Sequence, residues 1–396
     1  MDKKNNYLFI NHTSLIGGAS KSGTFILEAL NKNGIKPNII YRSGENGSFV
    51  KFMEERGIRY NKLIDFKHFP HPLYHFNGNY HKVYSLKFLK SLFFILLSIW
   101  PLISSIRRLK PRVVIINSLT VSWIAILIKI INTNIKVVCW VRETIPNEGK
   151  GFRNFIIKNI LKYFSDKIIF ISKFDLKQYP IAPHKLKLIY NPERDYENSI
   201  LDQGQKKFTF LFLGGINELK GTELFLKAFL FCLRNSDVKS RIILAGLSIY
   251  KPSQKYSKYE LRCLDLISKI NIEFPSCIEM IETISDINRL YREASIVIFC
   301  PNEIHQSRLI FESAINYKPI IVPNKKNIEE HLFKNVVLTY EENNFKSLAS
   351  VMTKLVNREL EIDEISLLEH KEFTLSKHSF GVFQKKINQL IQEVEN

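Results

Sequence analysis

Short apolar runs alternate with longer stretches of helical periodicity along most of the chain. Runs of four to six residues that are rich in Val and Ile are typical of strands buried on both faces of a parallel sheet. The pattern therefore predicts an α/β protein. Strands are predicted at Tyr7–Asn11, Lys36–Tyr41, Val113–Asn117, Val137–Val141, Lys167–Ile171, Phe208–Leu213, Arg241–Ala245, Ile296–Cys300 and Ile320–Val322.

The alternation of strands and helices runs through the chain twice, and 396 residues are enough for two cores. We expect two doubly wound, Rossmann-like domains that face each other across a cleft, over residues 1–195 and 207–375. The polar stretch between them, NPERDYENSILDQGQKK, contains Pro and Gly and is typical of a linker, which we place at 196–206. A terminal helix is predicted over 376–396. Sheets of this type bind ligands at the carboxyl ends of their strands.

The segment LKFLKSLFFILLSIWPLISSIRRLKPR, residues 86–112, departs from this alternation. Its uncharged run from Ser91 to Ile106 is shorter than the roughly 20 apolar residues of a membrane-crossing helix, and Pro101 interrupts it. Two interpretations remain. The segment forms a helix buried against the sheet, or a helix that lies in a membrane interface, which the basic flanks and Trp100 favour.

The positive charge is confined to the first half of the chain. Residues 1–195 contain 31 Lys and Arg against 12 Asp and Glu, whereas the remainder contains 26 of each. Such asymmetry indicates an anionic partner for one domain, either nucleic acid or an acidic membrane surface. No RRM, helix-turn-helix or KH signature accompanies the charge. We therefore expect an anionic membrane surface as partner, no nucleic acid, and the interfacial interpretation of residues 86–112.

The N-terminus and the cysteines bear on localisation. The opening MDKKNNYLFINHTSL has no long apolar run, and the five cysteines show no CxxC spacing, so we expect a reduced, cytoplasmic protein without a disulfide framework. Four histidines, His68, His71, His75 and His81, match no common zinc spacing. We expect neither a metal nor a cofactor.

Two loops that follow predicted strands contain residues suited to phosphate. Gly17-Gly18 lies between a strand and a helix, where glycine lets the backbone approach a phosphate at the helix N-terminus, although tight turns use such pairs equally well. In FLFLGGINELKGTELFLKAF, Lys220 opens an amphipathic helix and can pair with a diphosphate. It could also be an ordinary solvated lysine.

A third loop and helix contain a carboxylate within an apolar stretch, RLIFESAINYKPIIV. The helix is expected to begin near Ser307, which would place Glu312 in its first turn, where a carboxylate stabilises the helix dipole. Arg308 lies four residues earlier on the same face, so the two side chains could form a simple ion pair. Alternatively, Arg308 faces a phosphate and Glu312 accepts hydrogen bonds from two ribose hydroxyls.

The order of these motifs resembles that of the GT-B fold glycosyltransferases, specifically the large retaining group called family 4. The resemblance covers nearly the whole chain. It is carried by GGAS after the first strand, SDKIIFISKF, LIYNP, FLGGINELKGTELFLKAF and RLIFESAINYKPIIV. The family's fold is two Rossmann-like domains, which agrees with the strand pattern.

The resemblance implies roles for several of the residues above. Glu312 stands at the position of the glutamate that binds the ribose of the nucleotide sugar. Lys220 stands at the diphosphate lysine, and Gly17-Gly18 at the donor-phosphate loop of the first domain.

The chain also departs from the family pattern. The arginine that accompanies the lysine is replaced by Gly215, and Arg308 could supply the missing charge. The first glutamate of the Glu-x7-Glu motif falls at Ile304, so Glu303 or His305 would contact the transferred sugar in its place.

The stretch VVCWVRETIPNEGKGFR ends a predicted strand at Arg142-Glu143. Many relatives have a histidine at this strand end, close to the reacting sugar, so the resemblance makes Arg142 and Glu143, with Glu303, the catalytic candidates. Glu143 could instead form a salt bridge with Arg142 or Arg153.

These observations together predict a glycosyltransferase that moves a sugar from a UDP- or GDP-linked donor to a lipid-linked glycan with retention of configuration. We expect it to work in bacterial surface polysaccharide synthesis, peripherally on the inner face of the plasma membrane. Two alternatives remain open: a GT-B sugar-nucleotide epimerase, and a non-catalytic donor-binding partner subunit of a glycosyltransferase.

Overall fold

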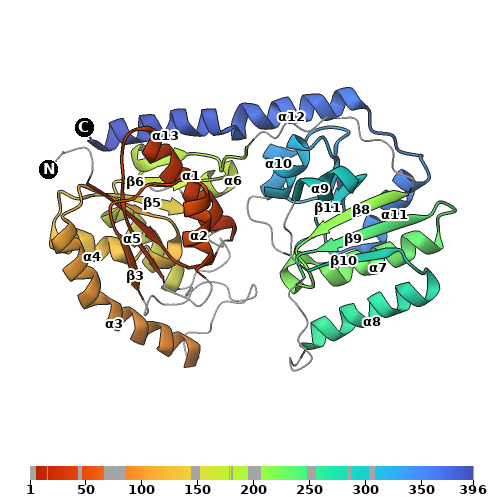
Figure 1. Cartoon of the computed structure of the whole chain (residues 1–396), viewed down its shortest axis with the longest axis horizontal. Helices are drawn as coiled ribbons and strands as arrows, with labels where there is room; N and C mark the ends of the chain where they lie inside the picture. Colours follow the sequence, from red (N-terminus) through yellow and green to blue (C-terminus); the bar gives the residue numbers. More distant parts are fainter. Residues whose placement is uncertain are drawn as a thin grey trace. The chain divides into compact units, whose positions relative to one another are not determined.

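The structure is a computed structural model that describes residues 6–15, 17–42, 47–66, 86–143, 152–177, 179, 182–194, 207–247, 256–282, 287–302 and 308–395. The chain divides into two compact units. The first unit comprises Met1–Pro192 together with Phe380–Asn396, and the second comprises Glu193–Ser379. Both are α/β units, as the apolar pattern predicts (Figure 1).

The first unit contains a seven-stranded sheet in the order β3-β2-β1-β4-β5-β6-β7. All neighbouring strands are parallel. The order reverses between β1 and β4, which is the position where doubly wound sheets bind ligands. The strands are β1 (Tyr7–Asn11), β2 (Asn38–Arg42), β3 (Leu63–Phe66), β4 (Val113–Ile116), β5 (Lys136–Val141), β6 (Lys167–Phe170) and β7 (Leu186–Leu188).

Helices cover both faces of this sheet. One face packs against α3, α4, α5 and α6, and the other against α1, α2 and α13. Because both faces are buried, β1 has no exposed residue and reads as a continuous apolar run. The helices are α1 (Gly18–Lys32), α2 (Ser48–Glu55), α3 (Leu86–Leu109), α4 (Ile124–Ile131), α5 (Phe152–Phe164), α6 (Lys173–Lys177) and α13 (Phe380–Glu395), with short 3-10 helices η2 (Leu119–Val121) and η3 (Pro183–Lys185).

The second unit contains a six-stranded parallel sheet in the order β10-β9-β8-β11-β12-β13. Its order reverses between β8 and β11. One face packs against α7, α8 and α11, and the other against α9, α10 and η5. The strands are β8 (Phe208–Leu213), β9 (Ser240–Ala245), β10 (Ile278–Ile281), β11 (Ile296–Ile298), β12 (Ile320–Pro323) and β13 (Val337–Tyr340). The helices are α7 (Thr222–Arg234), α8 (Lys258–Glu273), α9 (Ile287–Glu293), α10 (Arg308–Ile315), α11 (Phe345–Val356) and α12 (Glu364–His378), with η4 (Glu218–Lys220) and η5 (Lys326–His331).

The nine predicted strands are confirmed, with ends shifted by up to two residues. Four strands were not predicted, namely β3, β7, β10 and β13. The three residues of β7 and most of β10 are only partly buried, so these strands mix polar and apolar residues and lack a distinct pattern.

Two predicted boundaries are wrong. The stretch that reads as a linker from Asn191 onward begins with packed residues, because Asn191 and Glu193 are both buried, and the second unit begins at Glu193 rather than after residue 195. The predicted terminal helix over 376–396 spans two elements: α12 ends at His378, and α13 begins at Phe380 and packs in the first unit.

Residues 86–109 form one continuous helix, α3, which runs through Pro101. Its second half packs through Leu102 and Ile106, whereas Phe93, Leu96 and Trp100 are 57%, 66% and 74% exposed. The window Leu92–Leu109 is the one stretch of the described residues long and apolar enough to cross a membrane, and only 22% of it is buried.

Candidate functional site

The loop after β8 is built around two glycines. Gly214 has φ +143°, and a Cβ atom there would lie 2.8 Å from Cγ of Lys220. Gly215 has φ +62°, and its Cβ would lie 2.4 Å from the carbonyl oxygen of Gly246. Such backbone conformations and contacts require glycine. The absence of an arginine at Gly215 is therefore a property of the loop backbone, which crosses the end of β9 too closely for any side chain.

Lys220 ends η4, and its stem lies across Gly214. Part of the Lys220 side chain is accessible at the surface, but the surrounding protein atoms exclude much of the water from its ammonium group. This burial lowers the pKa of the ammonium group, and the carboxylate of Glu312 opposes the shift. The predicted diphosphate lysine and the predicted ribose glutamate thus interact electrostatically at the carboxyl edge of the second sheet.

Glu312 does not lie in the first turn of its helix. The described helix α10 begins at Arg308, so Glu312 is its fifth residue, and the interpretation as a helix-dipole carboxylate is wrong. One carboxylate oxygen of Glu312 accepts a hydrogen bond from the buried Tyr291 hydroxyl at 3.2 Å. The other lies 3.6 Å from Nε of Arg308. The ion pair considered from the i, i+4 spacing is therefore present, and Tyr291 adds a contact that the spacing did not indicate.

Arg308 also forms an ion pair with Glu193, whose side chain is only 2% exposed. The amide of Glu193 donates to the carbonyl oxygen of His378 at 2.7 Å, which fixes the backbone on which this carboxylate lies. Arg308 thus lies between two carboxylates, those of Glu193 and Glu312. Sequence analysis missed Glu193 because it belongs to the polar stretch interpreted as a linker.

The sequence-predicted candidates for the transferred sugar, Glu303, Ile304 and His305, lie outside the described residues. So do His68, His71, His75 and His81. Among the residues that the structure describes, no group of three or more His, Cys, Asp and Glu is placed to hold a metal ion.

In the first unit, Gly17 precedes α1 and Gly18 is its first residue. A Cβ atom at either position would meet nothing within 4 Å, and Gly17 has an extended backbone with φ −126°. Neither steric crowding nor backbone strain requires glycine here. The two residues leave open space above the N-terminus of a 15-residue helix, an arrangement suited to an anion.

Beside this loop, a polar network joins the ends of β1, β4 and β5. The Asn117 side-chain amide donates to Oδ1 of Asn11 at 3.0 Å. The Arg142 guanidinium donates through Nε to Oδ1 of Asn117 and through Nη1 to Oδ1 of Asn191, both at 2.8 Å. Arg142 is only 8% exposed. The candidate Arg142 is therefore held at the carboxyl edge of the first sheet by neutral amides.

Glu143 caps a short helix. Its carboxylate accepts hydrogen bonds from the Ser118 hydroxyl, from the amide of Leu119 at 3.1 Å and from the amide of Arg142 at 3.1 Å. These contacts fix the start of η2 and the end of β5. Of the two arginines considered as salt-bridge partners of Glu143, Arg153 has a side chain that lies outside the described residues.

The sequence was compared with protein-family models and with curated proteins. Residues 16–192 match the family model of Glycosyltransferase Family 4. Among curated proteins, no sequence matches the chain significantly.

Solved structures resemble the chain over nearly its whole length. Anabaena Alr3699/HepE in complex with UDP is 15% identical, with 98% of this chain and 100% of that chain covered and a TM-score of 0.74. A glycosyltransferase from Rickettsia africae ESF-5 is 18% identical, with 99% of each chain covered and a TM-score of 0.73. The apo form of the lipopolysaccharide outer core galactosyltransferase WaaB is 11% identical, with 98% and 99% covered and a TM-score of 0.67. At these identities the likeness shows the fold, which is that of two Rossmann-like domains.

Proposed function

We propose that this chain, a glycosyltransferase of the GT-B fold whose first domain matches Glycosyltransferase Family 4, transfers a hexosyl group from a nucleoside diphosphate sugar to a glycan acceptor with retention of configuration. The observation that carries the proposal is the cluster of Lys220, Arg308 and Glu312 at the carboxyl edge of the second sheet. It combines two cations with a hydrogen-bond acceptor, which suits a diphosphate joined to a ribose.

In this proposal Glu312 accepts hydrogen bonds from the ribose hydroxyls. Its carboxylate is already oriented by the Tyr291 hydroxyl on one oxygen and by Arg308 on the other. Such prior orientation reduces the entropy lost when a ligand binds. The Anabaena HepE structures contain UDP and UDP-glucose, which favours UDP over GDP as the carrier of the donor sugar.

Lys220 and Arg308 would stabilise the negative charge that builds on the departing diphosphate. Retaining transfer also passes through an oxocarbenium-like sugar. The leaving diphosphate can take the acceptor proton, so no protein nucleophile is required.

The experiment is calorimetric titration of UDP, GDP, ADP and their sugar conjugates into the wild type and the Glu312→Ala variant. We expect one nucleotide to bind and the variant to lose about 1–3 kcal/mol, the usual contribution of hydrogen bonds to a charged group. Glu361→Ala, at an exposed residue of the same unit, is the matched control and should bind normally. Equal binding by Glu312→Ala and the wild type would refute the ribose role.

For the acceptor, we propose a lipid-linked glycan of a bacterial surface polysaccharide, reached from the cytoplasmic face of the membrane. The exposed apolar side chains of α3, led by Phe93, Leu96 and Trp100, support this, as does the net charge of +19 in residues 1–195. The galactosyltransferase WaaB, which builds lipopolysaccharide outer core, shares the fold.

Co-sedimentation with anionic vesicles tests the membrane contact. Leu96→Ser combined with Trp100→Ser should release most of the protein from the vesicles at physiological salt. Leu261→Ser combined with Ile272→Ser removes two similarly exposed apolar side chains from α8 in the second unit and should have no effect. Equal release by both double variants, or a wild type that ignores the vesicles, would disprove the contact.

A further inference from the structure

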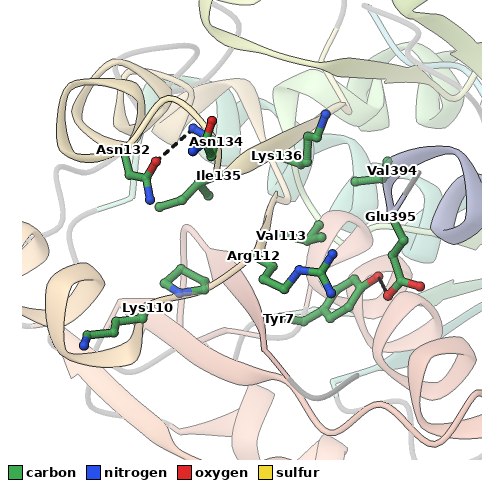
Figure 2. Close-up of a pocket in the computed structure, with 11 residues that line it drawn as sticks. Tyr7, Lys110, Arg112, Val113, Asn132, Asn134, Ile135, Lys136, Val394 and Glu395 are labelled. Atoms are coloured by element: carbon green, nitrogen blue, oxygen red, sulfur yellow. Dashed lines mark hydrogen bonds between the residues drawn. The ribbon is translucent and has the colours of Figure 1, made fainter. Parts of the chain in front are cut away.

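A cavity of about 340 Å³ lies at the amino edge of the first sheet, where β1, β4 and β5 begin (Figure 2). Its walls come from residues 110–113, residues 132 and 134–136, Tyr7 and the end of α13. Gly17-Gly18 and Arg142 lie at the opposite, carboxyl edge of the same parallel sheet. The cavity is therefore separate from the site proposed above.

The charged residues that line this cavity are mostly cations. Among the described residues they are Lys110, Arg112 and Lys136, with one carboxylate, that of Glu395. That carboxylate is engaged by the Tyr7 hydroxyl, which donates to it at 2.8 Å. Within the part of the chain that the structure describes, none of the three cations pairs with a carboxylate. Three cations around one cavity repel one another, and an anion bound between them would relieve that repulsion.

Elsewhere in the first unit, the cations near this edge have partners. Lys129 pairs with Asp166 at 2.7 Å, and Lys167 and Lys187 both pair with Glu393, at 2.7 and 2.6 Å. At this edge, cations that have a carboxylate partner therefore lie close to the three cavity cations, which have none among the described residues.

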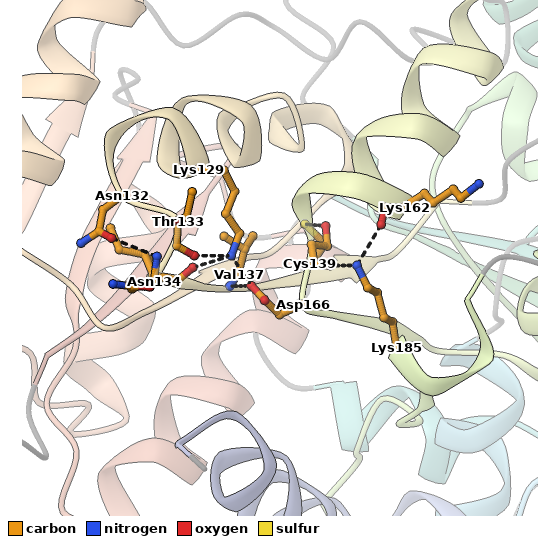
Figure 3. Close-up of polar contacts among 11 residues, drawn as sticks. Lys129, Asn132, Thr133, Asn134, Val137, Cys139, Lys162, Asp166 and Lys185 are labelled. Atoms are coloured by element: carbon orange, nitrogen blue, oxygen red, sulfur yellow. Dashed lines mark hydrogen bonds and ion pairs between the residues drawn. The ribbon is translucent and has the colours of Figure 1, made fainter.

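Helices α3 and α4 also end at this edge, and cations near a helix C-terminus are stabilised by the helix dipole. In the loop after α4, the backbone carbonyl oxygens of Thr133 and Ile135 already accept hydrogen bonds from the Lys129 ammonium group, at 3.2 and 2.8 Å (Figure 3). At α3 the last turn contains Arg107 and Arg108. The helix ends therefore do not account for Lys110, Arg112 and Lys136.

The backbone that carries these cations is held in place. Lys136 donates its amide to the Arg112 carbonyl oxygen at 2.8 Å, and Arg112 donates its own to Asn6 at 2.8 Å. Asp166, the partner of Lys129, also accepts the Val137 amide at 2.7 Å (Figure 3). The cavity walls are consequently formed before any ligand arrives, which lowers the entropic cost of binding.

Figure 2 shows the Arg112 side chain in the centre, beside the Tyr7 ring, with Lys110 and Lys136 on opposite sides. The planar fork of an arginine matches two phosphate oxygens, and the long stems of the lysines let their ammonium groups turn over the opening. We infer that this cavity is a second anion site, which binds a phosphate group through Arg112 with Lys110 and Lys136 at its rim.

The phosphate could belong to a lipid headgroup or to a soluble phosphate ester. Lys110 directly follows α3, whose exposed apolar side chains form the proposed membrane contact, so a lipid would place its headgroup near this cavity. That source rests on the proposed function, whereas the phosphate site itself does not.

The test compares the wild type with Arg112→Gln/Lys136→Gln. Glycerol 3-phosphate and inorganic phosphate are titrated by calorimetry, and vesicles with and without phosphatidylglycerol in phosphatidylcholine are co-sedimented. Lys51→Gln/Arg59→Gln, at exposed residues outside the cavity, removes the same charge as a control. The same titrations and co-sedimentations are made with Lys110→Gln, which removes one cation of the cavity and keeps Arg112. UDP titration of every variant separates this site from the donor site, because its binding should not change.

A soluble ligand is indicated if glycerol 3-phosphate or phosphate binds the wild type and binds Arg112→Gln/Lys136→Gln at least tenfold more weakly. A lipid headgroup is indicated if only phosphatidylglycerol vesicles bind and the same variant partitions several-fold less than the charge-matched control. The inference is overturned if neither ligand binds, or if the cavity variants and the control behave alike in both assays.

Discussion

An arginine with a largely covered side chain lies at the carboxyl edge of each sheet, 8% exposed at Arg142 and 15% at Arg308, but the two arginines have different partners. Arg142, at the edge of the first sheet, donates to the neutral amides of Asn117 and Asn191. Arg308, at the edge of the second, lies between the carboxylates of Glu193 and Glu312. Amides hold a guanidinium in place without cancelling its charge, whereas carboxylates cancel it.

The different partners of the two arginines affect how much of each positive charge is offset by the protein. At the proposed donor cluster, two carboxylates offset part of the charge of Arg308, so Lys220 would contribute the larger share of the attraction for a diphosphate. At the first sheet, two neutral amide side chains position the guanidinium of Arg142. The comparison predicts that the second edge is more sensitive to the loss of one charged partner than the first.

The largest effect is expected from Arg308→Ala. It leaves the carboxylate of Glu193, 2% exposed, without its cation, and breaking a buried pair in this way costs about 3–5 kcal/mol. Urea denaturation measures the loss. The double variant Glu193→Gln/Arg308→Met removes both charges and should recover at least half of it. A single variant as stable as the wild type would show that the pair is not buried in solution.

The second prediction concerns acid. The three histidines buried among the described residues, His331, His370 and His378, all lie in the second unit. Burial lowers the pKa of His370 to about 4. The unfolded chain, whose histidine has a pKa near 6.5, then binds the proton more readily, so stability is complete above that value and falls as the pH drops towards 4.

From pH 7 to pH 5 this histidine should lose about 2 kcal/mol of stability, measured by urea denaturation at the two pH values. His370→Phe preserves stacking on Phe333 and should remove that part of the loss. Exposed His184 provides the control, His184→Phe, which should retain it. An unchanged pH dependence in His370→Phe would contradict the assignment.

Arg142→Met should have a smaller effect than Arg308→Ala, of about 1–3 kcal/mol, because it leaves neutral amide oxygens without a donor instead of a buried charge. The same denaturation series measures it. If the two arginine variants were equally destabilised, the type of partner, amide or carboxylate, would not determine the cost of removing the arginine.

The smallest effect is expected from Ser118→Ala. It removes one of the hydrogen bonds by which Glu143 caps η2 and should cost about 0.5–1.5 kcal/mol. Transfer activity should stay near that of the wild type if this contact only supports the loop. A large fall in activity with unchanged stability would instead place the contact in the reaction.

The sequence predicts the fold well where burial is continuous. The central strands β1, β8 and β12 are mostly apolar, and their predicted bounds agree with the observed ones to within one residue. Edge strands such as β7 and β10 are half-buried, so their composition resembles that of loops. The sequence predicts a C-terminal helix. It does not predict that this helix packs in the first unit, because that packing depends on contacts with residues far away in sequence.

The site was predictable only where its residues are close in sequence. The spacing of Arg308 and Glu312 places them on one helix face, and the structure joins them. Glu193 lies 115 residues before Arg308, inside a polar stretch with the composition of a linker, and Tyr291 lies on a different helix from Glu312. No local pattern reveals such pairings.

The central claim is that Glu312 binds the ribose of a nucleoside diphosphate. A double cycle tests it most directly: UDP and 2′,3′-dideoxy-UDP are titrated into the wild type and into Glu312→Ala. We expect the wild type to bind UDP at least tenfold more tightly than the dideoxy analogue, and the variant to bind both alike. If the variant keeps the preference of the wild type for UDP, Glu312 does not contact the ribose and the proposed donor site is wrong.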